Sequence, residues 1–98
     1  MDIYKINFNN TNYILEFYQK FYQSLDLQID FIPGNNVHAV WDILTGFLDG
    51  QSKFYFYGVN SLPQELHNFF YNDFLEIFDE AKQWYSQFNK EFLFTIVD

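Results

Sequence analysis

The 98-residue chain contains no cysteine and no arginine. Without cysteine it can form no disulfide, and because small secreted domains often depend on disulfides, we expect a reducing, cytoplasmic location. The first residues lack the charged-then-apolar pattern of a secretory signal. No apolar stretch approaches the roughly 20 residues that a membrane-spanning helix needs. The sequence therefore argues against a secreted or membrane-inserted protein.

Positive charge is scarce. The chain has five lysines and 13 acidic residues, which gives a formal net charge of −8. A nucleic-acid-binding protein needs a basic surface to meet phosphates, so this composition excludes that class and disfavours anionic membranes. An acidic protein attracts basic surfaces instead and encounters them faster. Negative charge also serves solubility alone, and composition does not separate these two interpretations.

Aromatic side chains are abundant, at 24% of the residues. Because each one buries a large area, even a chain of this length can fill a real core. The length suits one domain and leaves no room for a second. Residues 1–98 are therefore expected to form a single domain.

Hydropathy periodicity predicts alternating strands and helices. A period of two or a short apolar run indicates strands at 3–8, 53–57 and 91–97. A period near 3.6 indicates helices at 12–25, from about 36 to 45, and over 62–88 with a break near Asn72. Strands separated by helices favour a parallel sheet. We therefore predict an α/β fold, a three-stranded parallel sheet packed with about four helices in the order β-α-α-β-α-α-β.

Each helical segment has an apolar face that is expected to point inward. These faces comprise Ile14, Phe17, Tyr18, Phe21 and Leu25, then Val37, Val40, Ile43, Leu44 and Phe47, and finally Phe74, Ile77, Phe78, Ala81, Trp84, Tyr85 and Phe88.

The second helical segment carries a polar stripe on its outer face. His38, Asp42 and Thr45 recur there at helical spacing, and Trp41 lies at the border with the apolar face. A polar stripe is most often only solvated. A tryptophan at such a border is either half-buried or an exposed binding anchor, and periodicity leaves both alternatives open.

Three acids follow one edge of the last helical segment, namely Asp73, Glu76 and Glu80. Like charges at this spacing mildly destabilise a helix. Either a partner needs these acids, or water simply tolerates them, and spacing does not decide between the two.

Catalytic and metal-binding patterns are missing. Carboxylates with a histidine can do acid–base chemistry or hold a metal, and His38, Asp42 and Glu80 are such residue types. The chain nevertheless lacks cysteine ligands, an HExxH motif, a glycine-rich phosphate loop and a nucleophile elbow. His67 has no recognisable ligand spacing. We expect no enzyme activity, no metal and no cofactor.

Two motifs resemble the barstar family, intracellular inhibitors of the ribonuclease barnase. Residues 34–47, Gly-Asn-Asn-Val-His-Ala-Val-Trp-Asp-Ile-Leu-Thr-Gly-Phe, are similar to the family's second-helix signature. Residues 78–82, Phe-Asp-Glu-Ala-Lys, are similar to the matching part of its last helix. The element order and the final strand at 92–97 also fit, so the resemblance covers the whole chain and implies a barstar-like domain.

The resemblance implies a function and a set of site residues. Asp42 matches the carboxylate that fills the phosphate site of the ribonuclease, and Glu80 matches a second acid that reaches a basic residue of the enzyme. Further positions at or near the contact surface are Gly34, Asn36, Trp41, Thr45, Gly46 and Asp49. The implied partner is a basic ribonuclease or nuclease toxin, bound 1:1 by a protein that is monomeric when free. The alternative is an immunity protein or antitoxin of the same fold, aimed at a toxin of different chemistry or bound away from its active site.

The chain also departs from the family pattern. His38 stands where the family has a second aspartate, and Phe47 replaces a tryptophan. Ile32 and Pro33 stand near its paired tyrosines. Histidine removes a negative charge one turn before Asp42 and adds a positive one at low pH. We therefore expect a target whose surface opposite His38 differs from that of barnase.

Overall fold

Three parallel strands form a single sheet in the order β1-β2-β3. The computed structural model describes residues 1–48 and 51–98. The strands are β1 (Asp2–Asn7), β2 (Ser52–Tyr57) and β3 (Phe92–Ile96). Tyr4 pairs with Phe54, and Phe54 pairs with Phe94 on the other side. The predicted α/β class and the parallel three-stranded sheet are confirmed.

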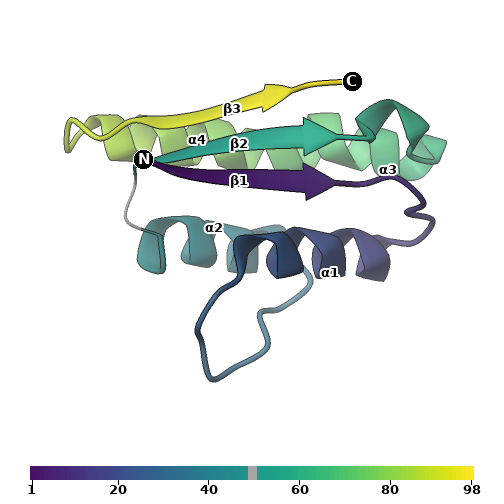
Figure 1. Ribbon diagram of the computed structural model, residues 1–98, viewed down its shortest axis with the longest axis horizontal. Coiled ribbons are helices and arrows are strands. Elements are labelled where there is room, and N and C mark those ends of the chain that lie inside the picture. Colours follow the sequence, from purple (N-terminus) through teal and green to yellow (C-terminus); the bar gives the residue numbers. More distant parts are fainter. Residues whose placement is uncertain (49–50) are drawn as a thin grey trace.

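The helices lie around this sheet (Figure 1). They are α1 (Ile14–Leu25), α2 (Val37–Gly46), α3 (Gln64–Phe69) and α4 (Leu75–Ser86). Figure 1 shows α4 behind the sheet, and α1 and α2 beneath β1. A short 3₁₀ turn, Val59–Ser61, follows β2. Among the described residues, no helix is both long and apolar enough to cross a membrane.

The expected break near Asn72 is wrong. A π-helical turn, Phe70–Phe74, joins α3 directly to α4, so the described residues form three continuous helical segments rather than about four helices. A π turn is wider than an α turn and shifts the register of the residues that follow it. The shift keeps side chains spaced by four on the inner face, and all of them are buried: Leu66, Phe70, Phe74 and Phe78.

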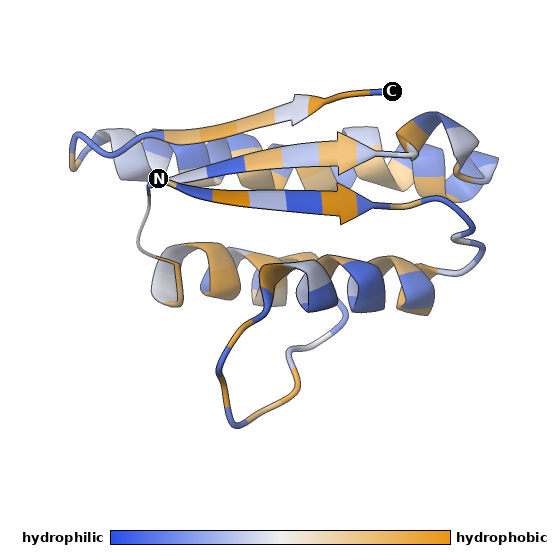
Figure 2. Cartoon of the chain, viewed as in Figure 1, coloured by the Kyte–Doolittle hydropathy of each residue, from blue (hydrophilic) through white to orange (hydrophobic). Residues whose placement is uncertain are grey.

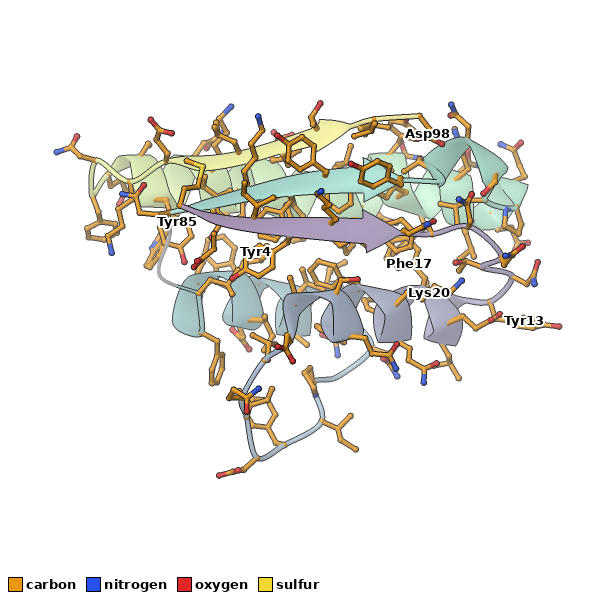
Figure 3. All side chains as sticks on the ribbon, in the orientation of Figure 1. Tyr4, Tyr13, Phe17, Lys20, Tyr85 and Asp98 are labelled. Atoms are coloured by element: carbon orange, nitrogen blue, oxygen red, sulfur yellow. The ribbon has the colours of Figure 1, made fainter. Side chains whose placement is uncertain are left out.

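The core is an aromatic layer between the sheet and the helices. Phe8, just after β1, stacks on Phe17 of α1 with ring centroids 4.3 Å apart. Phe17 meets Phe74 edge-to-face at 4.9 Å, and Phe54 of β2 meets Phe78 edge-to-face at 5.0 Å. Figure 3 shows Phe17 pointing from α1 toward the sheet. Aromatic pairs of this kind add about 1 kcal/mol each to the free energy of burial.

Three residues expected on inner faces are exposed instead. Ile14 is 40% exposed, Phe47 47% and Phe88 55%. Phe47 and Phe88 lie beyond the last residues of α2 and α4, where helical periodicity no longer sets the direction of a side chain. Ile14 is the first residue of α1. The three residues that periodicity placed wrongly thus lie at the first residue of a helix or beyond its last one.

Gly58 provides a test of the turn after β2. Its φ is +76°, and a β-carbon there would lie 2.6 Å from both the backbone nitrogen and Oδ1 of Asn9. We expect Gly58→Ala to lower the free energy of unfolding by more than ~1–2 kcal/mol, because it adds a clash to an unfavourable backbone conformation. Urea denaturation measures this. The matched control is Gly46→Ala, since among the described residues no atom beyond the adjoining backbone of α2 and the two chain neighbours lies within 4 Å of the added carbon. Equal stability of the two variants would contradict the expectation.

Candidate functional site

Two hydrogen bonds and one glycine shape the start of α2. Oδ1 of Asn36 caps the helix by accepting a hydrogen bond from the Ala39 N–H at 2.8 Å. The Tyr22 hydroxyl donates to the Gly34 carbonyl at 2.8 Å. A β-carbon on Gly34 would lie 2.9 Å from Nδ2 of Asn36, so glycine leaves room for the capping side chain. Gly34 and Asn36 therefore fix where α2 begins.

The other end of α2 is tied to α4. The Tyr85 hydroxyl donates to the carbonyls of Leu44 and Leu48, the second at 3.3 Å. Figure 3 marks Tyr85 in its place on α4. The inner side chains of α2 are buried, namely Val40, Ile43 and Leu44. With a capped start and an end bonded to α4, α2 is a rigid support for the side chains on its outer face.

That outer face presents a carboxylate without an internal partner. Asp42 and His38 are both exposed, one turn apart. Within residues 1–48 and 51–98, neither side chain makes a hydrogen bond or an ion pair. Thr45 is different, because its hydroxyl donates to the Trp41 carbonyl at 2.8 Å. Asp42 can thus bind a ligand without first breaking a hydrogen bond or an ion pair to the described part of the chain.

Trp41 is half-buried between α2 and α4. Its ring lies edge-to-face against Trp84, with centroids 6.2 Å apart and an interplanar angle of 72°. The first of the two alternatives for this tryptophan is therefore what the structure shows. Its role as a binding anchor stays a prediction.

Two grooves flank α2. The first measures about 530 Å³ and is lined by Phe31, Pro33, Gly34, Ala39, Asp42, Ile43, Thr45, Gly46 and Phe47. Within this lining, the rings of Phe31 and Phe47 pack against each other with centroids 5.5 Å apart. The second, which we call the acidic groove, measures about 480 Å³ and lies between the start of α2 and the α3–α4 segment. It is lined by Tyr18, Asn35, Asn36, Val37, Phe69, Asp73, Glu76, Ile77 and Glu80.

The predicted site residues are thus divided between these surfaces. The first groove brings together Gly34, Asp42, Thr45, Gly46 and Phe47, whereas Asn36 and Glu80 line the acidic groove. His38 is an exposed residue of α2 that lines neither groove. Asp49 lies outside the described residues.

Sequence reasoning missed Phe31, and it assigned Tyr18 to the core alone. Phe31 and its neighbour Ile32 are 51% and 94% exposed. They lie in the loop between α1 and α2, where several hydrophobic residues are visible (Figure 2). Two consecutive large apolar residues before a Pro-Gly turn were a usable signal, because a surface loop does not normally need them.

Metal binding finds no support in the part of the chain that the structure describes. There, no three side chains of His, Cys, Asp or Glu come together in a way that would hold a metal ion.

Comparison with known proteins identifies one matching family. A family model described as Barstar (barnase inhibitor) matches residues 1–97. The match spans both α2 and the acidic edge of α4, so it covers every described residue of the two grooves. A search of curated protein sequences returns no match.

Tyr18 predicts a pH dependence of stability. Burial, and secondly the negative charge of Asp73, raise its pKa from 10.0 to about 12. The unfolded chain therefore ionises this tyrosine first, and its stabilising contribution is complete below pH 10 and is lost as the pH rises from 10 through about 12. We expect Tyr18→Phe to lose less unfolding free energy than the wild type between pH 9 and 11.5 in urea denaturation.

The matched control is Tyr13→Phe, because Tyr13 is 70% exposed and points into solvent (Figure 3). It should leave the alkaline loss of stability unchanged. The same alkaline loss in Tyr18→Phe as in the wild type would show that this phenol is not responsible.

Proposed function

The chain belongs to the barstar family, and we propose that it binds a basic ribonuclease and blocks the active site with the carboxylate of Asp42. In this proposal the protein is a cytoplasmic inhibitor that is monomeric when free and forms a 1:1 complex. It is a binding protein and not an enzyme, in keeping with a family described by its inhibition of barnase.

The observation that carries the proposal is the state of Asp42. Its carboxylate is exposed and has no internal partner among the described residues. Ribonuclease active sites gather cationic side chains to hold phosphate, and a carboxylate meets the same donors in charge-assisted hydrogen bonds. Because α2 is capped by Asn36 and tied by Tyr85, Asp42 is held in place before binding. Such preorganisation lowers the entropy lost on association.

The charge of the whole chain supports the same partner. A net charge of −8 produces a long-range field that attracts a basic enzyme and raises the association rate. Glu80, exposed on α4, adds a second carboxylate on the side of α2 away from Phe47. The proposed interface therefore combines a central acid, a second acid and an apolar rim.

His38 and Phe47 give the interface its own specificity in this proposal. His38 is exposed one turn before Asp42, so this position offers no carboxylate to a basic target. Phe47 and Phe31 offer only apolar ring surface beside Asp42. A cognate ribonuclease would accordingly carry fewer cations opposite His38 and an apolar surface opposite the two rings.

The direct test replaces the central carboxylate. We expect Asp42→Ala to weaken binding to a basic ribonuclease by more than ~30-fold, the effect of losing a residue at the centre of an interface. Isothermal titration calorimetry measures this, with the ribonuclease that the wild-type protein recovers in a pull-down. The control Asp2→Ala removes the same charge from the start of β1 and should change affinity only slightly.

Equal effects of the two substitutions would rule out the active-site mechanism. Cleavage of a dinucleotide substrate by the bound enzyme gives a second readout. Full cleavage in the complex would favour the alternative, an immunity protein that binds away from the active site.

Gly46 tests the extent of the interface. Within residues 1–48 and 51–98, a β-carbon added there meets nothing within 4 Å beyond its chain neighbours and the nearby backbone of α2, so Gly46→Ala should leave stability unchanged or slightly raise it. The added methyl group projects from the first groove toward the proposed partner, and we expect affinity to fall by roughly tenfold through overpacking. Calorimetry and urea denaturation of one preparation separate the two effects. Unchanged affinity would place the end of α2 outside the interface.

A further inference from the structure

The acidic groove is separate from the groove that contains Asp42. It lies between the start of α2 and the outer edge of the α3–α4 segment, with Tyr18 of α1 between them. Three carboxylates follow its edge, from Asp73, Glu76 and Glu80. Its apolar lining comes from Val37, Phe69 and Ile77. A long side chain with a cationic end would therefore find both an apolar wall and a negative edge.

The hydroxyl group of Tyr18 indicates that this groove binds a ligand. Only 2% of its surface is exposed, yet it lines the groove, and its hydroxyl makes no hydrogen bond within the described residues. Among these residues, the one fully enclosed side-chain polar atom without a partner is Oγ of Ser52, so the Tyr18 oxygen opens to the groove. A polar group that is nine-tenths buried normally has a partner. Here the groove is where that partner can bind.

Within the part of the chain that the structure describes, the carboxylates of the groove do not cap α2, and those of Glu76 and Glu80 form no internal contact that would stabilise the fold. Asn36, not an acid, caps the start of α2. Within residues 1–48 and 51–98, Glu76 and Glu80 make no hydrogen bond or ion pair. Their i, i+4 spacing mildly destabilises the helix through repulsion of like charges. Burial, and secondly the negative charge of Asp73, raise the pKa of Tyr18.

The spacing of the three carboxylates and the Tyr18 hydroxyl favours a guanidinium group over a metal ion. A metal ion needs several ligands at one point, and the described residues offer no such cluster. A guanidinium group is planar and carries five N–H donors, so it reaches acceptors that are spread apart, and it stacks on aromatic rings. Phe69, a partly buried residue of the groove lining, supplies such a ring, with its centroid 5.9 Å from that of Tyr18.

We propose that the acidic groove binds an arginine side chain of the partner protein, with its guanidinium bonded to Glu76, Asp73 and the Tyr18 hydroxyl oxygen. The methylenes of this arginine lie along Val37 and Ile77. The identity of the partner rests on the proposed function, whereas the groove's preference for guanidinium does not. This contact lies on the other side of α2 from Asp42. The partner would therefore need an arginine at this position in addition to the cationic groups that meet Asp42.

The test titrates the full ¹⁵N-labelled chain with N-acetyl-L-arginine methylamide. Amide resonances at the groove, including those of Asn36, Val37 and Phe69, should shift in a saturable way. N-acetyl-L-citrulline methylamide, which has nearly the same shape and no charge, should shift them little. Glu76→Gln should weaken binding of the arginine probe by roughly fivefold, as expected for losing one charge-assisted pair.

Stability separates a ligand site from a structural role. Glu76→Gln should leave the free energy of unfolding unchanged or slightly raised, because it relieves repulsion with Glu80. Tyr18→Phe removes the acceptor oxygen and should also weaken probe binding. The matched control is Glu65→Gln, since Glu65 is an exposed acid of α3 that does not line the groove. It should leave probe binding unchanged.

Three results would overturn the inference. They are equal shifts with the citrulline probe, equal weakening by Glu65→Gln and Glu76→Gln, or the same shift pattern with Mg²⁺ alone. Asp42→Ala should leave the shifts of the acidic-groove resonances unchanged, even if the probe also contacts Asp42 in the wild type. If the arginine probe fails while Asp42→Ala still abolishes ribonuclease binding, only this inference falls and the proposed function stands.

Discussion

Edge-to-face packing of phenylalanine rings holds the sheet and the helices together, and the rest of the structure depends on it. Phe74 and Phe78, on the π turn and α4, meet Phe17 of α1 and Phe54 of β2. Because these rings interlock, the loss of one leaves a cavity that several elements share. The position of α2 follows from this layer, since α2 packs chiefly against α4.

The candidate site is a consequence of how α2 is held. Trp41 against Trp84, and the Tyr85 hydroxyl on the carbonyls at the end of α2, attach one helix to the other. The acids of α4 and the outer face of α2 therefore keep a fixed relation to each other. A rigid acidic surface suits an inhibitor, because carboxylates that are already in place lose little entropy when a cationic active site meets them.

Sequence patterns predicted much of this arrangement for identifiable reasons. Strand alternation and helix periodicity are local, so the parallel α/β order followed from them and is confirmed. The break near Asn72 was wrong because hydropathy does not distinguish a π turn from the end of a helix. The directions of Phe47 and Phe88 were wrong because both residues follow the last residue of a helix. The family resemblance of residues 34–47 agrees with the family match over residues 1–97.

The sequence by itself determined the acidity of the chain, the order of its elements, and the placing of His38 and Asp42 on one outer stripe of α2. These features depend on composition and on short-range periodicity. Only the tertiary structure decided that Trp41 is half-buried against Trp84, that Asp42 lies in one groove and Glu80 in another, and that Tyr18 opens toward three carboxylates. Each of these features depends on residues that are far apart in the chain. A local sequence pattern does not determine which helix faces pack together once the aromatic core has formed.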